Sequence, residues 1–173
     1  MLNERFTFRS IDSENTQEVD YTIYMEELCM DPGEGCSPDE IMSKVNAAPE
    51  LFLLAIDNET GEIAGYVNGI ATNEDVITDE FFDDGGRLHN PDGSTVMLVS
   101  LVVMPKYRGQ GLAREIMRVY AEREKAKGRK RMILTCVERK IKMYEKFGYR
   151  LLGVSESVYS GLVWYDMDII LNG

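Results

Sequence analysis

Residues 107–113, with the sequence YRGQGLA, are the part of the chain whose composition and spacing most clearly predict chemistry. They lie between an apolar run and an amphipathic stretch, so they should form a loop that leads from a strand into a helix. Such a loop presents successive backbone N–H groups at the positive end of a helix dipole, which is how proteins bind phosphates. The pattern is neither G-x-G-x-x-G nor G-x-x-x-x-G-K-[ST], which disfavours a Rossmann site and a P-loop. The alternative is a tight turn that needs glycine only for its dihedral angles.

A second segment, residues 143–149, reads MYEKFGY and offers the hydroxyl of Tyr144. A tyrosine hydroxyl with a pKa of about 10 is protonated at neutral pH, so it can donate a proton or a hydrogen bond to a leaving group. The alternative is an aromatic packing residue one helical turn from Phe147.

The elements that must position these two segments follow from hydrophobic periodicity and turn residues. We expect, in order, a strand, two helices, three strands, a helix, a strand, a helix and two final strands. They cover residues 6–8, 12–28, 37–45, 51–56, 63–71, 96–104, 111–127, 131–137, 140–147, 149–158 and 162–171. Residues 74–92, with many acids and glycines, should form an irregular excursion and a candidate functional loop.

Two of these helices carry N-terminal signals. Ser37, followed by Pro38 and Glu40, predicts a capping box with proline at the first helical position. Residues 12–13 can cap the preceding helix, whose apolar face should include Leu28.

The strand predicted over 96–104 is apolar on both faces except at Ser100, which indicates a central strand. A helix joins it to the strand predicted over 131–137, so these two strands must run parallel. The sequence therefore predicts an α/β fold with a mixed sheet, mostly antiparallel with this one parallel pair, and helices on both faces. A length of 173 residues suits one core, and we expect a single domain over residues 1–173.

Together, the two segments resemble the GNAT superfamily of N-acetyltransferases. The pyrophosphate loop of that family has the form [Q/R]-x-x-G-x-[G/A], which Arg108, Gly111 and Ala113 fill, and its [FM]-Y-[ED]-[KR]-x-G-[FY] stretch is similar to residues 143–149. The resemblance implies a GNAT-like fold, acetyl-CoA as acyl donor and direct transfer of the acetyl group to an amine. It implies no metal, and one histidine with scattered cysteines lacks the spacing of a metal-ligand set.

The resemblance also implies which residues form the site. The backbone of the strand before the loop would pair with the pantetheine arm, the loop amides would bind the pyrophosphate, and the tyrosine would protonate the departing thiolate. The cofactor-binding residues implied in this way are Leu101, Val102, Val103, Arg108, Gly109, Gln110, Gly111, Leu112, Ala113, Arg114 and Tyr144, and the catalytic residue is Tyr144.

Three further segments look like the serotonin or arylalkylamine N-acetyltransferase branch and its microbial relatives. They are residues 69–71, 88–93 and 161–167. That branch often places two histidines on the central strand to take the proton of the substrate amine, and the matching positions here are Met97 and Val99. Since alternate strand residues share a face, Met97, Val99 and Leu101 should form one apolar face. Without a histidine base, we expect kcat/KM to keep climbing above pH 8.

The base itself is left open by the sequence. His89, the only histidine, lies in the irregular 74–92 segment, where a solvated turn residue is the expectation. Glu26, Glu27 and Glu138 could act as bases through water, although ordinary surface carboxylates are the simpler interpretation.

The overall composition favours a soluble enzyme. A formal charge of -11 would repel nucleic acid and anionic membranes, and it suits a cationic amine substrate. Three cysteines without a C-x-x-C spacing indicate a reducing compartment. The first residues have neither a basic nor an apolar signal region, and no run is long enough to cross a bilayer, so we expect a cytoplasmic protein.

Three functional alternatives follow from the sequence. The acceptor could be a small amine, or a lysine or N-terminal amine of a protein, or the chain could be an acyl-CoA sensor without turnover. A closed pocket roofed by residues 30–38 would favour a small amine, and a broad groove would favour a protein. A homodimer is a candidate assembly because dimers are common in the superfamily, but no interface is evident.

Overall fold

Seven strands form one sheet in the order β1-β2-β3-β4-β5-β7-β6 in the computed structural model, which describes residues 2–173. Only β4 and β5 run parallel, and every other neighbouring pair is antiparallel. The strands are β1 Phe6–Ser10, β2 Phe52–Asp57, β3 Ile63–Thr72, β4 Thr95–Val103, β5 Arg131–Cys136, β6 Arg150–Val154 and β7 Tyr165–Ile170. The predicted fold class, with its single parallel pair, is confirmed.

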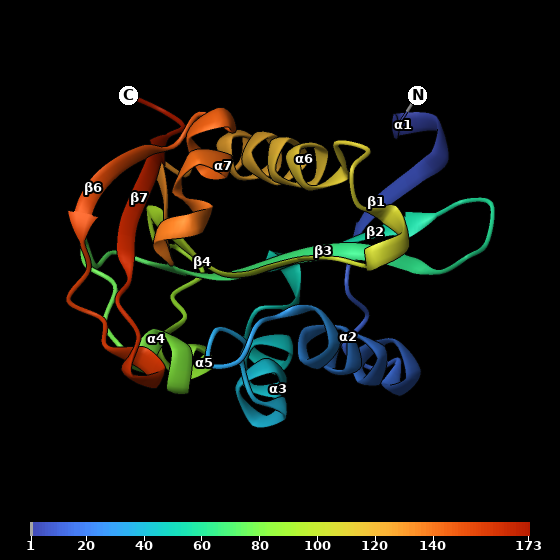
Figure 1. Ribbon diagram of the computed structural model, residues 1–173, viewed down its shortest axis with the longest axis horizontal. Helices are drawn as coiled ribbons and strands as arrows, with labels where there is room; N and C mark the ends of the chain where they lie inside the picture. The colour runs from blue at the N-terminus through green and yellow to red at the C-terminus, as the bar shows by residue number, and fades with distance from the viewer. Residues whose placement is uncertain (1) are drawn as a thin grey trace.

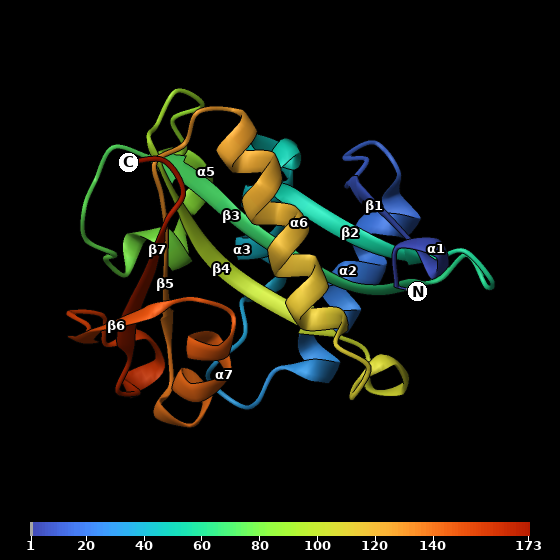
Figure 2. The same ribbon diagram turned by 90° about the horizontal axis from the view of Figure 1, so that it is seen from above.

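Helices cover both faces of this sheet. The α-helices are α1 Leu2–Arg5, α2 Thr16–Cys29, α3 Pro38–Ala47, α4 Glu80–Asp83, α5 Gly85–Leu88, α6 Leu112–Ala126 and α7 Ile141–Lys146. Short 3-10 turns occur at Pro49–Leu51, Pro105–Tyr107, Glu138–Lys140 and Tyr159–Gly161. Figure 1 shows α6 and α7 above the sheet and α2, α3, α4 and α5 below it, and Figure 2 shows α6 lying across β3 and β4.

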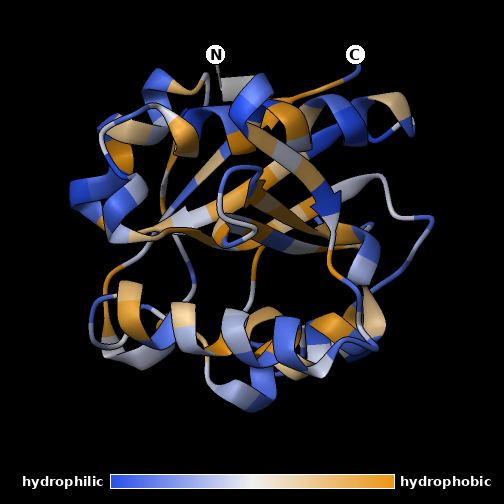
Figure 3. Cartoon of the chain, turned by 90° about the vertical axis from the view of Figure 1, so that its right-hand side faces the viewer, coloured by the Kyte–Doolittle hydropathy of each residue, from blue (hydrophilic) through white to orange (hydrophobic). Residues whose placement is uncertain are grey.

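The core follows these layers. Leu98, Leu134, Ile116 and Tyr144 belong to a cluster between the sheet and the helices α6 and α7. Two further clusters lie on the opposite face, one under α2 and α3 and one under α4. Coloured by hydropathy, the apolar residues concentrate on the strands and on helix sides that face them (Figure 3). Among the described residues, none of the helices combines the length and the apolar character that a bilayer crossing requires.

The helix starts show where local signals suffice and where they do not. Ser37 and Glu40 form the predicted capping box at the start of α3. The prediction for α2 was wrong by a few residues: its cap is Asn15, whose side chain accepts from the Glu18 N–H. Leu28 was also placed wrongly, since its side chain is 50% exposed at the end of the helix.

Two segments differ from the sequence expectation. The 74–92 excursion contains the short helices α4 and α5, and it is fixed by the Lys44 ammonium, which donates to the Phe82 carbonyl at 3.2 Å. The last two strands are shorter than predicted because residues 155–164 form a loop. In that loop the Trp164 indole donates to the Tyr159 carbonyl at 2.9 Å, and Ser157 donates to Asp79 at 2.5 Å.

Candidate active site

The parallel strands β4 and β5 separate partway along their length. They pair only from Thr95 with Arg131 to Leu98 with Leu134, although β4 continues to Val103. The backbone of β4 beyond Leu98 therefore has no strand partner on this side among residues 2–173. Two small cavities, of about 20 and 30 Å³, lie in this gap, which we call the split.

Tyr144 lines both cavities of the split. Its ring meets Phe147 and Tyr149 edge-on, with centroids 6.0 and 5.9 Å away. Burial, and then the proximity of Cys136, raise the pKa of the Tyr144 hydroxyl. The raised pKa keeps this hydroxyl protonated at neutral pH. Since no hydrogen-bond partner is recorded for it among the described residues, it is free to donate to a ligand in the split.

The glycine loop forms a second feature next to the split. Gly109 and Gly111 have φ angles of 77° and 80°, a left-handed conformation that side chains with a Cβ rarely adopt. Gly111 is the N-cap of α6, and no side chain caps this helix, whereas α2 and α3 are capped by Asn15 and Ser37. The first N–H groups of α6 therefore remain available to a ligand.

A cavity of about 300 Å³, the loop cavity, opens at this helix end. Seven of the sequence-predicted residues line it, together with Tyr107 and Phe147. The seven are Val103, Arg108, Gly109, Gly111, Leu112, Ala113 and Arg114. A loop with open space at Gly109, a helix terminus without a cap and a cavity of this size fit a pyrophosphate group.

The side chains of the predicted loop residues differ in what they contact. Arg108 donates to the Val103 carbonyl at 3.0 Å, and Gln110 donates to the Lys106 carbonyl at 3.4 Å. Arg114 donates to the Lys146 carbonyl at 3.1 Å and lies over the ring of Phe147. Gln110 is outside the loop cavity lining, and the buried side chain of Val102 packs on the opposite face, with α2 and α3.

A β-bulge at Val99 changes which face the following residues occupy. Gly69 pairs with Leu98 and Asn68 pairs with Ser100, so Val99 has no partner on β3. The Asn68 side chain accepts the Ser100 N–H at 3.2 Å, which satisfies a backbone group next to the bulge. At Gly69 the two strands lie so close that a Cβ would be 2.5 Å from the Met97 carbonyl oxygen.

The expectation that Met97, Val99 and Leu101 share a face was therefore wrong. Met97 and Val99 pack on the α4 side of the sheet, whereas Leu101 packs against the α6 and α7 cluster. The extra residue interrupts the two-residue alternation of a strand. Ser100, next to Val99, is turned towards α2.

Ser100 meets a buried carboxylate there. Glu26 of α2 is 1% exposed, and its oxygens accept from the Tyr66 hydroxyl at 2.6 Å, the Ser100 hydroxyl at 2.8 Å and the Cys36 N–H at 2.8 Å. The interpretation of Glu26 as an ordinary surface carboxylate was wrong. Glu27 and Glu138 are exposed, as expected of surface residues.

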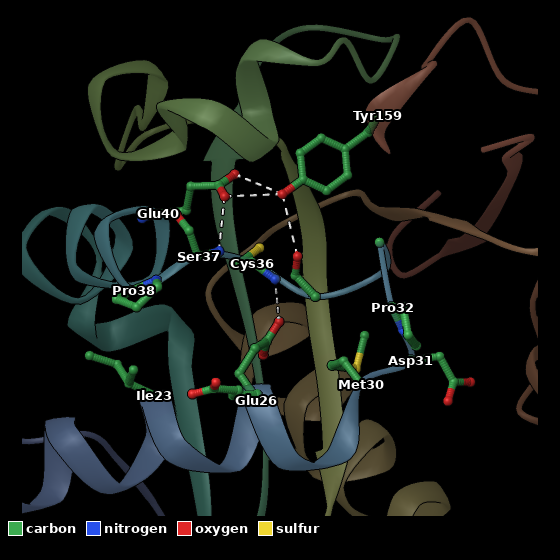
Figure 4. A pocket seen from close by; sticks show the side chains of 13 residues that line it. Ile23, Glu26, Met30, Asp31, Pro32, Cys36, Ser37, Pro38, Glu40 and Tyr159 are labelled. Atoms are coloured by element: carbon green, nitrogen blue, oxygen red, sulfur yellow. Dashed lines mark hydrogen bonds between the residues drawn. The ribbon is translucent and has the colours of Figure 1, made fainter. Parts of the chain in front are cut away.

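Glu26 lines the largest cavity described for the chain, of about 420 Å³. This α2–α3 cavity is bounded by α2, by residues 30–38, by the start of α3 and by Tyr159 (Figure 4). The Tyr159 hydroxyl is 3.0 Å from a Glu40 carboxylate oxygen and also donates to the Gly35 carbonyl at 3.3 Å. The titratable acids of the lining are Glu26, Glu27, Asp31 and Glu40, and no lysine or arginine among the described residues lines the cavity.

Residues 30–38 also form ion pairs with the segment that follows β5. The Arg139 guanidinium forms ion pairs with Asp31 and Glu34, and Lys140 pairs with Glu34 at 3.2 Å. Met30 lines both the α2–α3 cavity and the split, so the two adjoin there, and Glu34 of the same segment lines the split alone.

His89 lies away from all these cavities. Its side chain is 3% exposed, so the expectation of a solvated turn residue was wrong. The ring accepts the Ala71 N–H at Nδ1 and is 3.0 Å from Glu50 at Nε2. Ala71 pairs with Val96 at the start of β4, whereas the split lies beyond Leu98.

Sequence reasoning missed Ser100 and Tyr159, and it undervalued Glu26. The one available signal was Ser100 itself, the single polar residue in an otherwise apolar central strand. Within residues 2–173, no group of three or more His, Cys, Asp and Glu is arranged to hold a metal ion.

Comparisons with known proteins complete the description of the site. Residues 13–149 match the family described as the acetyltransferase (GNAT) family. The chain is 26% identical over 134 residues to the serotonin N-acetyltransferase of Mesocricetus auratus, covering 77% of this chain and 62% of that protein. The match therefore spans less than two thirds of that relative's length.

Solved structures share the fold at low identity. The loading GNATL domain of CurA from Lyngbya majuscula has a TM-score of 0.80 at 13% identity, covering 96% of this chain and 98% of that chain. A chain of the NatC complex bound to Gag peptide and CoA has a TM-score of 0.75 at 16% identity, again covering 96% and 98%. At these identities the similarity shows the fold alone.

Proposed function

Because the chain belongs to the GNAT acetyltransferase family, we propose that it transfers the acetyl group of acetyl-CoA to the primary amine of a small cationic molecule. The observation that carries this proposal is the buried hydroxyl of Tyr144, which lines the split and has no recorded partner among the described residues. It lies where the strands β4 and β5 separate, next to the glycine loop.

The donor would occupy the split and the loop cavity. Its pyrophosphate would accept hydrogen bonds from the N–H groups of Gly109 to Arg114, at the uncapped end of α6. Its pantetheine arm would lie along Leu101, Val102 and Val103, pairing with backbone that has no strand partner on that side among residues 2–173. Arg108 and Arg114 would add positive charge at the entrance of the loop cavity.

In the reaction, the amine nitrogen attacks the thioester carbonyl carbon and forms the new C–N bond. The C–S bond breaks, its electron pair goes to sulfur, and Tyr144 donates its proton to that sulfur. Burial raises the pKa of Tyr144, which keeps the hydroxyl protonated across the neutral range. Holding both reactants in adjoining cavities converts a bimolecular step into one within a ternary complex.

The acceptor would occupy the α2–α3 cavity. Residues 30–38 form one wall of it, and the contact between Tyr159 and Glu40 crosses it, which suits a compact molecule better than a chain of residues. Its acid lining, without a described lysine or arginine, favours a cation, since opposite charges attract strongly in a partly buried site. A formal charge of -11 would attract the same class of substrate at longer range.

The test mixes the protein with acetyl-CoA and a panel of amines and follows the release of free CoA thiol. The panel contains small primary amines with one or two positive charges, neutral amines, and peptides with a lysine or a free N-terminus. Turnover with small cationic amines supports the proposal. Turnover with peptides alone would identify a protein acceptor. Stabilisation by acetyl-CoA without turnover on any amine would identify a sensor.

A further inference from the structure

We propose that Ser100 and Glu26 together accept the proton that the acceptor amine loses. This inference rests on the acetyl transfer proposed above, and it assigns the base that the apolar residues Met97 and Val99 cannot supply. It comes from the contact between a strand residue and a carboxylate of α2, which the bulge at Val99 makes possible.

The carboxylate of Glu26 is held as a proton acceptor. The Ser100 hydroxyl and the Cys36 N–H donate to it, and the Tyr66 hydroxyl lies between its Oε1, at 2.6 Å, and the Thr22 carbonyl oxygen, at 3.1 Å. A buried carboxylate needs donors on most of its about four lone-pair positions, and these contacts hold the Glu26 side chain in one orientation with Oε2 against Ser100. A purely structural anchor would have the same contacts, so position must decide between the two roles.

The position of the pair is what favours proton transfer. Ser100 lines the split together with Leu101 and Tyr144. Glu26 lines the α2–α3 cavity. The hydrogen bond of 2.8 Å from Ser100 Oγ to Glu26 Oε2 therefore connects the cavity proposed for the thioester with the cavity proposed for the amine.

The proton step balances with these two groups. The bound ammonium first passes one N–H proton to Ser100 Oγ, while the proton of Ser100 passes to Glu26 Oε2. The neutral amine then attacks the thioester carbon, and its second N–H proton leaves to solvent as the C–N bond forms. The serine is neutral before and after the step, the carboxylate becomes a carboxylic acid, and the sulfur receives the proton of Tyr144. Solvent then returns a proton from Glu26 to the Tyr144 phenolate.

Several other titratable groups surround Glu26. Tyr66 comes from β3, Cys36 from the 30–38 segment and Cys29 from α2 itself. Glu40 and Lys44 of α3 lie near Cys36. Burial raises the pKa of Cys36 to about 12 and that of Tyr66 well above its usual value. Burial also raises the pKa of Cys29. These three groups therefore remain protonated and do not compete with Glu26 near neutral pH.

Glu26→Gln is the central test, read as the pH dependence of kcat/KM with a primary alkylamine between about pH 6.5 and 9.5. Such an amine titrates at about 10.4. Because Ser100 and Glu26 can deprotonate the ammonium form, the wild-type enzyme should give a flat profile, in place of the climb above about pH 8 that the sequence alone predicts. The variant can use only the neutral amine, whose fraction rises about tenfold per pH unit. We expect a loss of about 100-fold or more at pH 7 that shrinks as the pH rises.

Three further variants separate proton transfer from support of the fold. Ser100→Ala should reproduce the rising profile, because it leaves Glu26 in place and removes only the connecting hydroxyl. Ser100→Thr keeps the hydroxyl and should restore the flat profile. Asp20→Asn, an exposed acid on the same helix, should leave both the rate and the profile unchanged. If Glu26→Gln does not fold, the two Ser100 variants still decide the question.

The outcomes also distinguish this inference from the proposed function. An active wild type with a flat profile, together with a Glu26→Gln variant whose profile runs parallel to it at lower rate, would show that Glu26 is only structural. A wild-type profile that already rises with pH would overturn the inference as well. A wild type that acetylates no amine would instead overturn the proposed function.

Discussion

The two sides of the central sheet form their parts of the site in different ways. On the α6 side, the loop cavity is lined by residues within 103–114 and by Phe147. On the α2–α3 side, residues within 23–40 and Tyr159 line the cavity, but its buried Glu26 is held by side chains of β3 and β4, far away in the sequence. A surface made of local backbone depends on local spacing. A surface of converging side chains depends on the whole fold.

Tyr144→Phe gives the largest expected effect and tests the α6 side. It removes the hydroxyl and keeps the ring contacts with Phe147 and Tyr149, so binding of acetyl-CoA should be nearly intact. We expect kcat to fall by about 100-fold or more, as for loss of a positioned acid. Steady-state rates and acetyl-CoA binding by calorimetry measure the two quantities.

The matched control is Tyr149→Phe. Its hydroxyl is buried without a hydrogen-bond partner among the described residues, and Tyr149 lines neither cavity of the split. Its kcat should equal that of the wild type. An unchanged kcat in Tyr144→Phe, with chemistry shown to be rate-limiting, would mean that the thiolate leaves by another route.

Gly111→Val tests the backbone of the glycine loop on the same side of the sheet. Its effect, on the affinity for acetyl-CoA, should be somewhat smaller than the effect of Tyr144→Phe on kcat. The φ of 80° at Gly111 is strained for valine, and a side chain at the helix end blocks the approach of a pyrophosphate. We expect acetyl-CoA to bind about tenfold to a hundredfold more weakly, since a lost hydrogen bond to a charged pyrophosphate costs about 1.5–3 kcal/mol. The affinity is measured by calorimetry.

Gly61→Val provides the comparison for strain alone. Gly61 has a φ of 76° in the turn between β2 and β3, with open space around it. The Gly61→Val variant should have a lower melting temperature and an unchanged affinity for acetyl-CoA. Equal affinity losses in both variants would contradict a phosphate-binding role for the loop.

Glu40→Gln tests the α2–α3 side and should have a moderate effect. Glutamine keeps an oxygen for the Ser37 N–H, so the capping box persists while the charge is lost. We expect KM for a cationic amine to rise about fivefold, or about 1 kcal/mol, with KM for acetyl-CoA unchanged. Asp39→Asn on the same helix is the control. A rise in the KM of acetyl-CoA instead would show that the two sides are not separate.

Asp57→Asn should have the smallest effect, on stability alone. The Arg5 guanidinium and the Tyr107 hydroxyl hold the pKa of this buried carboxyl below its usual range. A lowered pKa stabilises the fold above the unfolded value of about 3.9, and the effect is lost as the pH falls through the folded value. The variant should melt about 2–4 °C lower at pH 7, and the difference should narrow between about pH 5 and 2. A gap that widens on acidification would contradict this assignment.

The sequence predicted the α6 side more completely than the other. The glycine loop, the parallel pair and Tyr144 are evident from local spacing, because a strand, a turn and a helix start each depend on neighbouring residues. The capping box at Ser37 was found for the same reason. Leu28 was misplaced because helical periodicity alone does not reveal which turn the sheet covers.

The α2–α3 side depends on contacts that no local pattern reports. Glu26 looks like any helical surface acid until β3 and the 30–38 segment enclose it. His89 was expected to be solvated because its partners, Ala71 and Glu50, lie far away in the sequence. The bulge at Val99 leaves no composition signal of its own, since valine is an ordinary strand residue.

That bulge also limits how residue roles can be transferred between relatives. An alignment without a gap through β4 assumes that residues two positions apart lie on the same face of the sheet. This holds only as far as Val99. In a homologue without the bulge residue, the polar side chain that occupies the place of Ser100 in space would fall in a different column of the alignment. Comparison of residue roles in β4 across this family therefore requires superposition of the strand, because residues beyond Val99 do not keep the alternation of residues 97 and 99.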